Sequence, residues 1–501
     1  MMQSGLRNDI ALSIAAGFAC CFFSYALALN PFTSYSGYDP AIFQQVGLGM
    51  LQGRIPYVDL FDHKGFLLYA VNAIGLWLSP GHTGLYCLLS LCLSATFLCW
   101  LRISAFLMGN HALRYLHALL AMSFACLREG GNMTETWSLL PLSIPIYYLV
   151  RQEFEGQEIS LRDCFCIGVC IGIVAHFRLN NIMPALAVCL YIFLDLLHRK
   201  EFTKLAKETW LVFLGGCLVV LSVGGLYAGL YGLQHMEDYW FGNIGFNLLY
   251  VDRFAHEPLW RASGFYFPAL SLTMMLCCGW NRGKKLVWFT LSAFLLTLLT
   301  TGRAYYAHYF TLFSPLIVVS LSLALGNNVF SIKKLDWRLT GLILLVLTAG
   351  LVGIFRKAVM QKADNLVRRE KAIAECSEVL NALDEKQKAS IWNYNTMTAG
   401  ANVLQRSGLV QCNRIFLPFQ SKGDYGVAET KGLTETCPEV ILADGETMRE
   451  ERIPANAPEN EGKAAELAFI RQNYHLIYHS HSMIQMMKIC IYARNKRPAL
   501  Q

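Results

Sequence analysis

The run IALSIAAGFACCFFSYALAL, residues 10–29, contains twenty residues and no charged side chain. A helix of this length crosses the ~30 Å hydrocarbon core of a bilayer. It also satisfies its own backbone hydrogen bonds in lipid. The run is longer than the apolar core of a signal peptide, and no small-residue cleavage site follows it. We therefore expect a retained membrane helix over residues 10–30.

The rest of the chain continues this pattern. Of its 501 residues, 54% are hydrophobic and only 15% are charged, which excludes an ordinary soluble globular protein. Apolar runs predict about eleven transmembrane helices. They lie near residues 10–30, 83–107, 112–128, 135–150, 164–178, 180–197, 209–231, 262–280, 286–301, 309–326 and 339–355. The sequence thus predicts a polytopic α-helical membrane protein.

Lysine and arginine residues are concentrated in alternate loops. The basic loops contain Arg102 and Arg114, Arg151 and Arg162, HRKEFTKLAK (198–207), NRGKK (281–285) and SIKKLDWR (331–338). All lie on one side if residues 66–80 do not cross, and the positive-inside rule makes that side cytoplasmic. The N-terminus is then cytoplasmic, and the chain after residue 355 lies outside. The net charge of +7 comes from these clusters and does not indicate nucleic acid.

Residues 31–82 form the first external loop in this topology. The stretch AIFQQVGLGMLQ (41–52) has helical periodicity, with Pro40 suited to the first turn. A second stretch, HKGFLLYAVNAIGLWLSPG (63–81), is apolar but short, with aromatic residues and Pro80 near its ends. It predicts a helix that lies in the membrane interface rather than one that crosses.

From about residue 356 the composition changes to that of a soluble domain, so we divide the chain into a transmembrane domain (1–355) and an extracytoplasmic α/β domain (356–501). Helices are predicted over 361–386 and 398–409, and strands in SIWNYN (390–395), RIFLPF (414–419), EVILADG (439–445) and MKICIYARN (487–495). This part also contains Cys376, Cys412, Cys437 and Cys490, among which an oxidising exterior allows a disulfide of undetermined pairing.

Two acidic residues are candidates for acid–base chemistry. Asp39 follows the first membrane helix closely, in GYDPAIF. One interpretation is a helix N-cap, which Asp provides well. The other is a general base held at a helix end beside a membrane cavity. Glu135, at the external start of a predicted span, is either a second acid of that cavity or a first-turn residue favoured by the helix dipole.

Several basic side chains are predicted on the same external face. In the loop, Arg54, His63 and Lys64 belong to GRIPYVDLFDHKG (53–65), and Arg178, Arg303 and His308 follow or precede predicted spans. Such groups bind anions, and a phosphate at a lipid headgroup is the obvious one. The alternatives are contacts with lipid headgroups, snorkelling side chains and local structural pairs.

The residues 38–69, YDPAIFQQVGLGMLQGRIPYVDLFDHKGFLLY, resemble the first external loop of GT-C glycosyltransferases. The acidic residue, GRxPYxDxFDHKG and the apolar tail occur in that family's order. The overall organisation is similar to bacterial family-39-like enzymes, which are relatives of protein O-mannosyltransferases and of the lipid A aminoarabinose transferase. NMTETWSLLP (132–141) and GRAYYAHYFTLFSP (302–315) are weaker matches.

The resemblance implies a GT-C-like inverting glycosyltransferase of the cytoplasmic membrane, with a polyprenyl-phosphate sugar donor and an envelope glycan, glycolipid or protein acceptor. It implies that Asp39 is the catalytic carboxylate, that Lys64 binds the donor phosphate and that Glu135 matches the second acidic position. Relatives often have an acidic pair where this chain has Asp39 and Pro40. That departure leaves both a two-carboxylate site and a divalent cation open.

Two other classes of function fit part of the pattern. A transporter or flippase of lipid-linked or anionic precursors would account for many spans and for charge near the membrane. Its binding site would lie at broken helices in mid-membrane, whereas the candidates here lie at helix ends. A non-catalytic envelope assembly protein would keep the architecture alone. A polymerase or ligase of lipid-linked glycans would use the same donor class.

Overall fold

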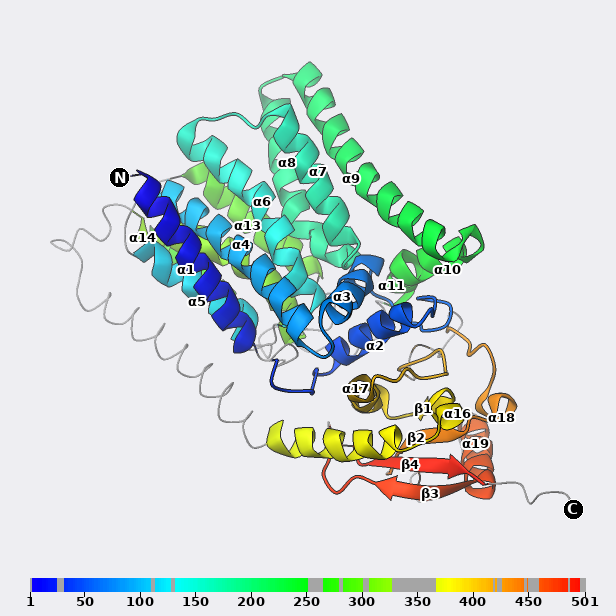
Figure 1. The fold of residues 1–501 in the computed structure, drawn as a ribbon. Coiled ribbons are helices and arrows are strands. Elements are labelled where there is room, and N and C mark those ends of the chain that lie inside the picture. The colour runs from blue at the N-terminus through cyan, green and yellow to red at the C-terminus, as the bar shows by residue number, and fades with distance from the viewer. Residues whose placement is uncertain are drawn as a thin grey trace, which may run out of the picture.

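The structure is a computed structural model, and Figure 1 shows its fold. It describes residues 2–24, 31–109, 113–127, 131–250, 265–278, 283–300, 306–326, 366–417, 420, 426–445, 448, 459–484 and 487–495.

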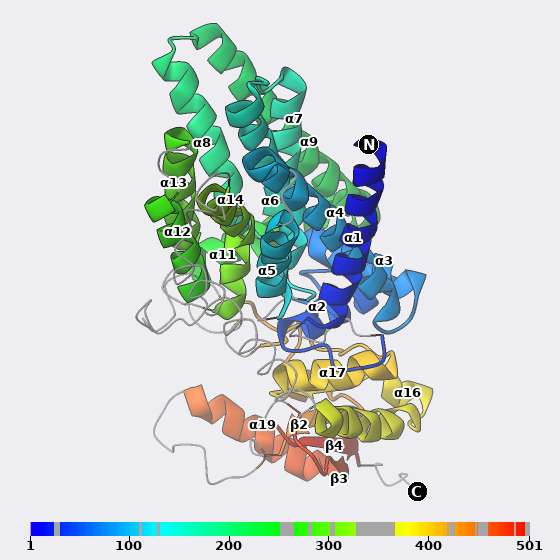
Figure 2. The same cartoon turned by 90° about the vertical axis from the view of Figure 1, so that its left-hand side faces the viewer.

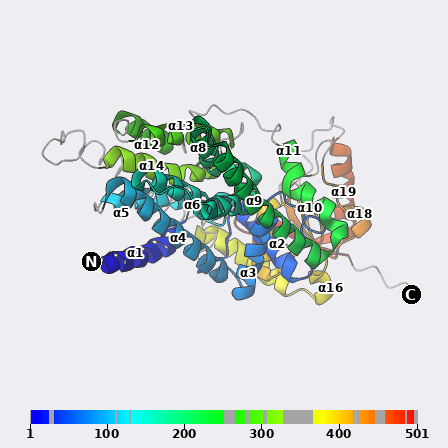
Figure 3. The same cartoon turned by 90° about the horizontal axis from the view of Figure 1, so that it is seen from above.

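Helices dominate the first 326 residues. The long ones are α1 (Met2–Phe22), α4 (Thr83–Met108), α5 (Leu113–Leu127), α6 (Thr134–Glu155), α7 (Leu161–Ala175), α8 (Met183–His198), α9 (Phe202–Tyr231), α12 (Tyr266–Cys278), α13 (Lys284–Thr300) and α14 (Ser314–Leu325). Short helical segments join them: η1 (Leu179–Ile182), η2 (Leu233–His235), α10 (Met236–Trp240), η3 (Phe241–Gly245), α11 (Phe246–Tyr250) and η6 (Ala307–Phe313). Viewed from above, α1 and α4 lie on one side of this bundle, and α12 and α13 lie on the other (Figure 3).

Four helical segments of the described chain are long and apolar enough to cross a membrane: Thr83–Met108, Leu179–His198, Phe202–Tyr231 and His308–Leu325. Phe66–Leu78, Leu113–Cys126 and Tyr266–Cys277 are apolar but shorter. These segments fit a membrane protein. The total of about eleven spans stays a prediction, and the span predicted at 339–355 lies outside the described residues.

The first loop contains two short helices, α2 (Asp39–Leu51) and α3 (Phe66–Leu78). Each has 13 residues and is therefore about 20 Å long, shorter than the hydrocarbon core. Trp77 at the end of α3 is 73% exposed. Both helices lie across one end of the bundle (Figure 1). Two short helices were predicted in this loop, and the structure contains both. Their position in the membrane interface stays a prediction.

The C-terminal part contains a four-stranded sheet in the order β1–β2–β4–β3. Its strands are β1 (Ile391–Tyr394), β2 (Val440–Asp444), β3 (Tyr474–His479) and β4 (Ile489–Arg494), and only β1 and β2 are parallel. The helix over 366–381 and α17 (Met397–Ser407) cover one face. The other face packs against α18 (Leu433–Thr436) and α19 (Glu459–Asn473). Because both faces are covered, every residue of β2 is buried.

Two strand predictions need correction. RIFLPF (414–419) is not a strand of the sheet: in its described part, Ile415 makes an isolated bridge with Phe61 of the first loop. Conversely, Tyr474–His479 is a strand that the pattern did not predict. It lies at the sheet edge and is largely exposed, so it lacks the alternation of a half-buried strand. The strands over 390–395, 439–445 and 487–495 and the helix over 398–409 are confirmed within one or two residues.

The α/β domain lies at the same end of the bundle as α2 and α3, opposite the N-terminus (Figure 2). Arg114, which forms an ion pair of 2.9 Å with Asp9, belongs to the other end. The first loop and the C-terminal domain thus share one end of the bundle. That this end faces the outside of the cell stays a prediction. Cys376, Cys412, Cys437 and Cys490 are free thiols in the structure.

Candidate functional site

Asp39 is the first residue of α2, and its side chain is partly buried. Tyr38 occupies the N-cap position, and its side chain makes no cap hydrogen bond. The N-cap interpretation of Asp39 is therefore not supported. A carboxylate in the first turn interacts favourably with the helix dipole, while its oxygens stay available. In the described part of the chain, no hydrogen bond or ion pair engages this carboxylate.

A buried ion pair joins the starts of two other elements near Asp39. Arg178, which directly precedes η1, places Nη1 3.1 Å from Oε1 of Glu135 in the first turn of α6. Its Nη2 donates a hydrogen bond of 2.7 Å to the hydroxyl of Tyr309, and the guanidinium lies 4.5 Å from the centre of that ring. Oε2 of Glu135 is buried and has no hydrogen-bond partner among the described residues. Tyr309 thus fixes the guanidinium of Arg178, whereas Oε2 of Glu135 keeps an unused hydrogen-bond acceptor within the described part of the chain.

Asp39 lies within electrostatic reach of this pair. Its charge acts on Arg178 and on the hydroxyl of Tyr309. One turn along α2, Phe43 lies on the same helix face as Asp39, and its ring centre is 5.9 Å from Nζ of Lys64. The start of α2 therefore contributes a carboxylate near Arg178 and, one turn later, an aromatic ring near Lys64.

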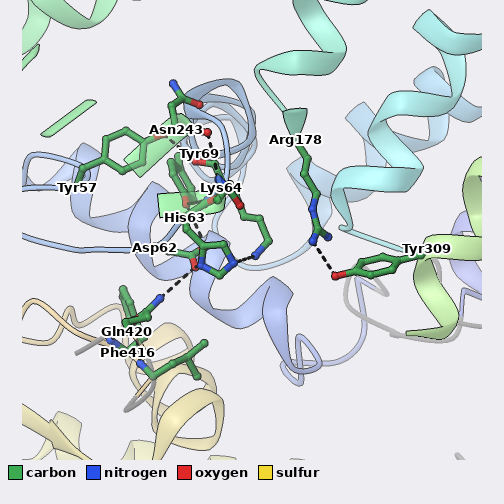
Figure 4. Close-up of polar contacts among 12 residues, drawn as sticks. Tyr57, Asp62, His63, Lys64, Tyr69, Arg178, Asn243, Tyr309, Phe416 and Gln420 are labelled. Carbon is green, nitrogen blue, oxygen red and sulfur yellow. Dashed lines mark hydrogen bonds and ion pairs between the residues drawn. The ribbon is translucent and has the colours of Figure 1, made fainter. Parts of the chain in front are cut away.

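The second group is a chain of three consecutive side chains, Asp62, His63 and Lys64 (Figure 4). Nδ1 of His63 lies 3.3 Å from Oδ1 of Asp62, and Nζ of Lys64 lies 3.0 Å from Nε2 of His63. Because an ammonium only donates, Nε2 accepts, and the proton of a neutral ring sits on Nδ1 facing Asp62. Within the described residues Lys64 makes no other side-chain hydrogen bond, so two of its N–H donors remain for a ligand.

Burial and neighbouring charges fix the protonation of this chain. All three side chains are buried. Burial alone would raise the pKa of Asp62, but Lys64 and His63 hold that pKa well below its usual value. Burial and the charge of Lys64 lower the pKa of His63. Asp62 is therefore a carboxylate, and the His63 ring next to it is neutral.

Two tyrosines hold the chain in place. The hydroxyl of Tyr69, in α3, donates to Oδ2 of Asp62 at 3.0 Å and accepts from the backbone N–H of Lys64 at 3.0 Å. The hydroxyl of Tyr57 donates to the backbone carbonyl of Lys64 at 2.8 Å. Tyr57 and Tyr69 are fully buried, and their rings make an edge-to-face contact. The two tyrosines thus fix the backbone of Lys64 and the carboxylate of Asp62.

Gly65 brings this chain to the end of α7. A Cβ atom at this position would lie 1.9 Å from the carbonyl oxygen of His176, and the Gly65 N–H donates to the carbonyl of Phe177 at 3.1 Å. Only glycine permits so close an approach. Arg178 directly follows Phe177, so this contact brings the loop close to Arg178. The charge of Arg178 accordingly acts on His63.

The structure brings together Asp39, Glu135, His63, Lys64 and Arg178 from the predicted set. His308, in η6, belongs to the same group, because its charge acts on Glu135. Arg54 does not: it follows the opposite end of α2 from Asp39, and its charge acts on Cys412 of the α/β domain. Arg303 lies outside the described residues.

Sequence reasoning missed three partners of these groups. Asp62 lies within the FDHKG motif but received no role, although a carboxylate next to His and Lys was a usable signal. Tyr309 lies in GRAYYAHY (302–309), where the sequence analysis gave a role only to Arg303 and His308. Gln420, whose amide donates to Oδ1 of Asp62 at 3.3 Å, gave no signal at all.

No three His, Cys, Asp or Glu side chains converge as metal ligands in the described ranges. Asp39 and Glu135 alone would give a divalent cation too few protein ligands without the substrate phosphate.

Comparison of the chain with protein-family models gives no match, and comparison with curated proteins gives none either. The resemblance to GT-C glycosyltransferases therefore rests on the motifs and the organisation of the chain.

The site combines one available carboxylate with cations fixed by buried partners. The carboxylate can accept a proton, and the cations can hold an anion in a region shielded from water, where charge interactions are stronger than in bulk solvent. All of these groups lie at one end of apolar helices. The arrangement therefore suits chemistry on an anionic group carried by a lipid.

Proposed function

We propose that this protein is an inverting glycosyltransferase that moves a sugar from a polyprenyl-phosphate donor to an acceptor of the cell envelope. The reaction takes place at the outer face of the cytoplasmic membrane. The acceptor is a hydroxyl of a glycan, a glycolipid or a protein.

One observation supports the proposal: the carboxylate of Asp39 lies within the electrostatic field of Arg178, whose side chain is only 10% exposed and is fixed by its partners. Arg178 is held by Glu135 and Tyr309, so its position does not depend on the ligand. A base next to a pre-positioned cation is what a one-step displacement of a phosphate requires.

In the proposed step, the sugar passes directly from the phosphate to the acceptor. The acceptor oxygen attacks the anomeric carbon, and the bond between that carbon and the phosphate oxygen breaks. Asp39 takes the proton of the acceptor hydroxyl, and the electron pair leaves with the polyprenyl phosphate. Arg178 and Lys64 stabilise the charge of the departing phosphate. A single displacement inverts the anomeric configuration.

The apolar helices support the choice of donor. A polyprenyl chain would lie against the apolar surfaces of the bundle, while its phosphate remains at the end where α2 and α3 lie. A sugar already linked to phosphate needs no nucleotide-binding fold, and the sequence contains neither GxGxxG nor a P-loop.

The experiment uses purified protein in lipid vesicles, a panel of radiolabelled polyprenyl-phosphate sugars and membrane-extract acceptors. We expect transfer from at least one donor and a product whose anomeric configuration, measured by NMR, is opposite to that of the donor. Retention of configuration would contradict the one-step mechanism. Absence of transfer from every donor would favour the transporter or assembly interpretations, which movement of labelled lipid across the vesicle membrane separates.

A further inference from the structure

We propose that the C-terminal α/β domain is part of this site, and that its Gln420 is a positioning residue. In this proposal, Gln420 fixes the carboxylate of Asp62 and, through it, the ring of His63 and the ammonium of Lys64. The link from Lys64 to donor binding rests on the proposed function, whereas the link from Gln420 to His63 does not.

The amide of Gln420 has only one orientation compatible with its surroundings. Its Oε1 accepts the backbone N–H groups of Phe416 at 3.3 Å and Leu417 at 3.0 Å. Its Nε2 must therefore point the other way, where it donates to Oδ1 of Asp62 at 3.3 Å. Gln420 and Asp62 are both buried, so this bond is shielded from water. Gln420 thus joins a turn of the α/β domain to Asp62, the first residue of the Asp62–His63–Lys64 group.

The preceding residue, Phe61, is held by the same domain. Its backbone N–H donates to the carbonyl of Arg414 at 2.8 Å. The guanidinium of Arg414 donates to the carbonyl of Tyr57 at 2.6 Å and forms an ion pair of 3.0 Å with Asp238. Arg414 therefore ties the loop both to the domain and to α10. These contacts fix the backbone on which Asp62 sits, and they leave its orientation to Gln420 and Tyr69.

The same carboxylate oxygen serves two partners. Oδ1 of Asp62 receives the Gln420 amide and also faces Nδ1 of His63. When the amide is lost, more of the negative charge of Oδ1 falls on His63, and the ring is protonated more readily. The other charged groups that act on His63 are Lys64 and Arg178, and the ring of Phe246 packs at 5.3 Å from it. A protonated ring can no longer accept from Lys64, so that ammonium loses its anchor.

The test compares Gln420→Met with Gln52→Met in the full-length protein in lipid. Gln52 donates to the carbonyl of Gly408, so it joins the same two parts of the molecule without touching the Asp62 chain. The readout is the ring ¹⁵N signal of His63, assigned by its loss in His63→Gln and followed from pH 8 to pH 5. We expect a neutral ring with its proton on Nδ1 in the wild type, and protonation at a higher pH in Gln420→Met only.

Donor kinetics give the second readout. Loss of one hydrogen bond that anchors Lys64 is expected to lower kcat about fivefold, with a smaller change in the donor KM, because Lys64 stabilises the departing phosphate in the proposed step. Gln52→Met should leave both unchanged. An unaltered His63 titration in Gln420→Met, or an equal change in both variants, would overturn the proposal. If the wild type transfers no sugar, the glycosyltransferase fails, while the ¹⁵N signal still decides whether Gln420 positions His63.

Discussion

Arg178 is held by two side chains of the site, Glu135 and Tyr309. Its guanidinium pairs with the fully buried carboxylate of Glu135 and also contacts the partly buried phenol of Tyr309. Taking such charges out of water costs several kcal/mol, which only good geometry repays. A charged pair kept at this position, next to an available carboxylate, is more readily explained by ligand binding than by stability.

Replacing Arg178 by Met should leave Glu135 as an uncompensated buried charge. We expect this variant to lose roughly 3–5 kcal/mol of unfolding free energy, seen as a lower thermal unfolding midpoint in detergent. The double variant Arg178→Met with Glu135→Gln should recover most of that loss. The control is Arg199→Met, because Arg199 forms a half-exposed surface pair with Asp195 and should change stability by about 1 kcal/mol or less. Equal losses for the two single variants would contradict this account.

The protonation of His63 should make stability depend on pH. The pKa of this ring is lowered in the folded state, so it stays neutral where an unfolded chain, with a pKa of 6.5, binds a proton. Stability should therefore fall as the pH drops below 6.5, and His63→Gln should flatten that decline. His479 is exposed, so His479→Gln should leave the curve as in the wild type. Thermal unfolding between pH 8 and pH 5 measures this, and parallel curves for all three proteins would refute it.

The site depends on how closely the first loop approaches the end of α7. The Gly65 backbone contacts the last residues before Arg178, and this contact aligns two segments about 110 residues apart in the sequence. No side chain mediates this contact, so its geometry tolerates little change.

Gly65→Ala should push the loop away from His176. The added methyl would overlap a backbone carbonyl, which cannot rotate away, and we expect a loss of about 1–3 kcal/mol. Sugar transfer should fall more steeply than stability, because Lys64 moves relative to Arg178. In α9, a Cβ added to Gly229 meets nothing within 4 Å, so Gly229→Ala should be neutral or slightly stabilising. Wild-type transfer by Gly65→Ala would show that this approach is unnecessary.

Elements with strong local patterns were predictable. The apolar periodicity, the position of Pro40 and the short length of the second stretch predicted α2 and α3, because these signals are local. The segment RIFLPF (414–419) was predicted as a strand because it is rich in apolar residues, but in its described part only Ile415 pairs, in a single bridge with Phe61 of the first loop. The edge strand Tyr474–His479 escaped because exposure removes the hydrophobic signal.

For the whole molecule, the sequence predicted a bundle and a separate α/β domain, but not how they meet. Docking depends on pairs such as Asn402 with Ser36 and Gln45 with Leu409, which are more than 360 positions apart. No pattern within either segment encodes such a pairing. Most ionisable residues of the site were therefore named one by one from the sequence, with Asp62 and Tyr309 as the exceptions, whereas Gln420 required the assembled molecule.

The most direct test of the central claim is sugar transfer by Asp39→Asn compared with Glu237→Gln, both as folded full-length protein in lipid. Glu237 is exposed on α10 and serves as the matched loss of one carboxylate near the same end. We predict that Asp39→Asn loses at least about a hundredfold in kcat, while Glu237→Gln keeps wild-type rates. Equal transfer by wild type and Asp39→Asn would remove Asp39 from the mechanism and contradict the account.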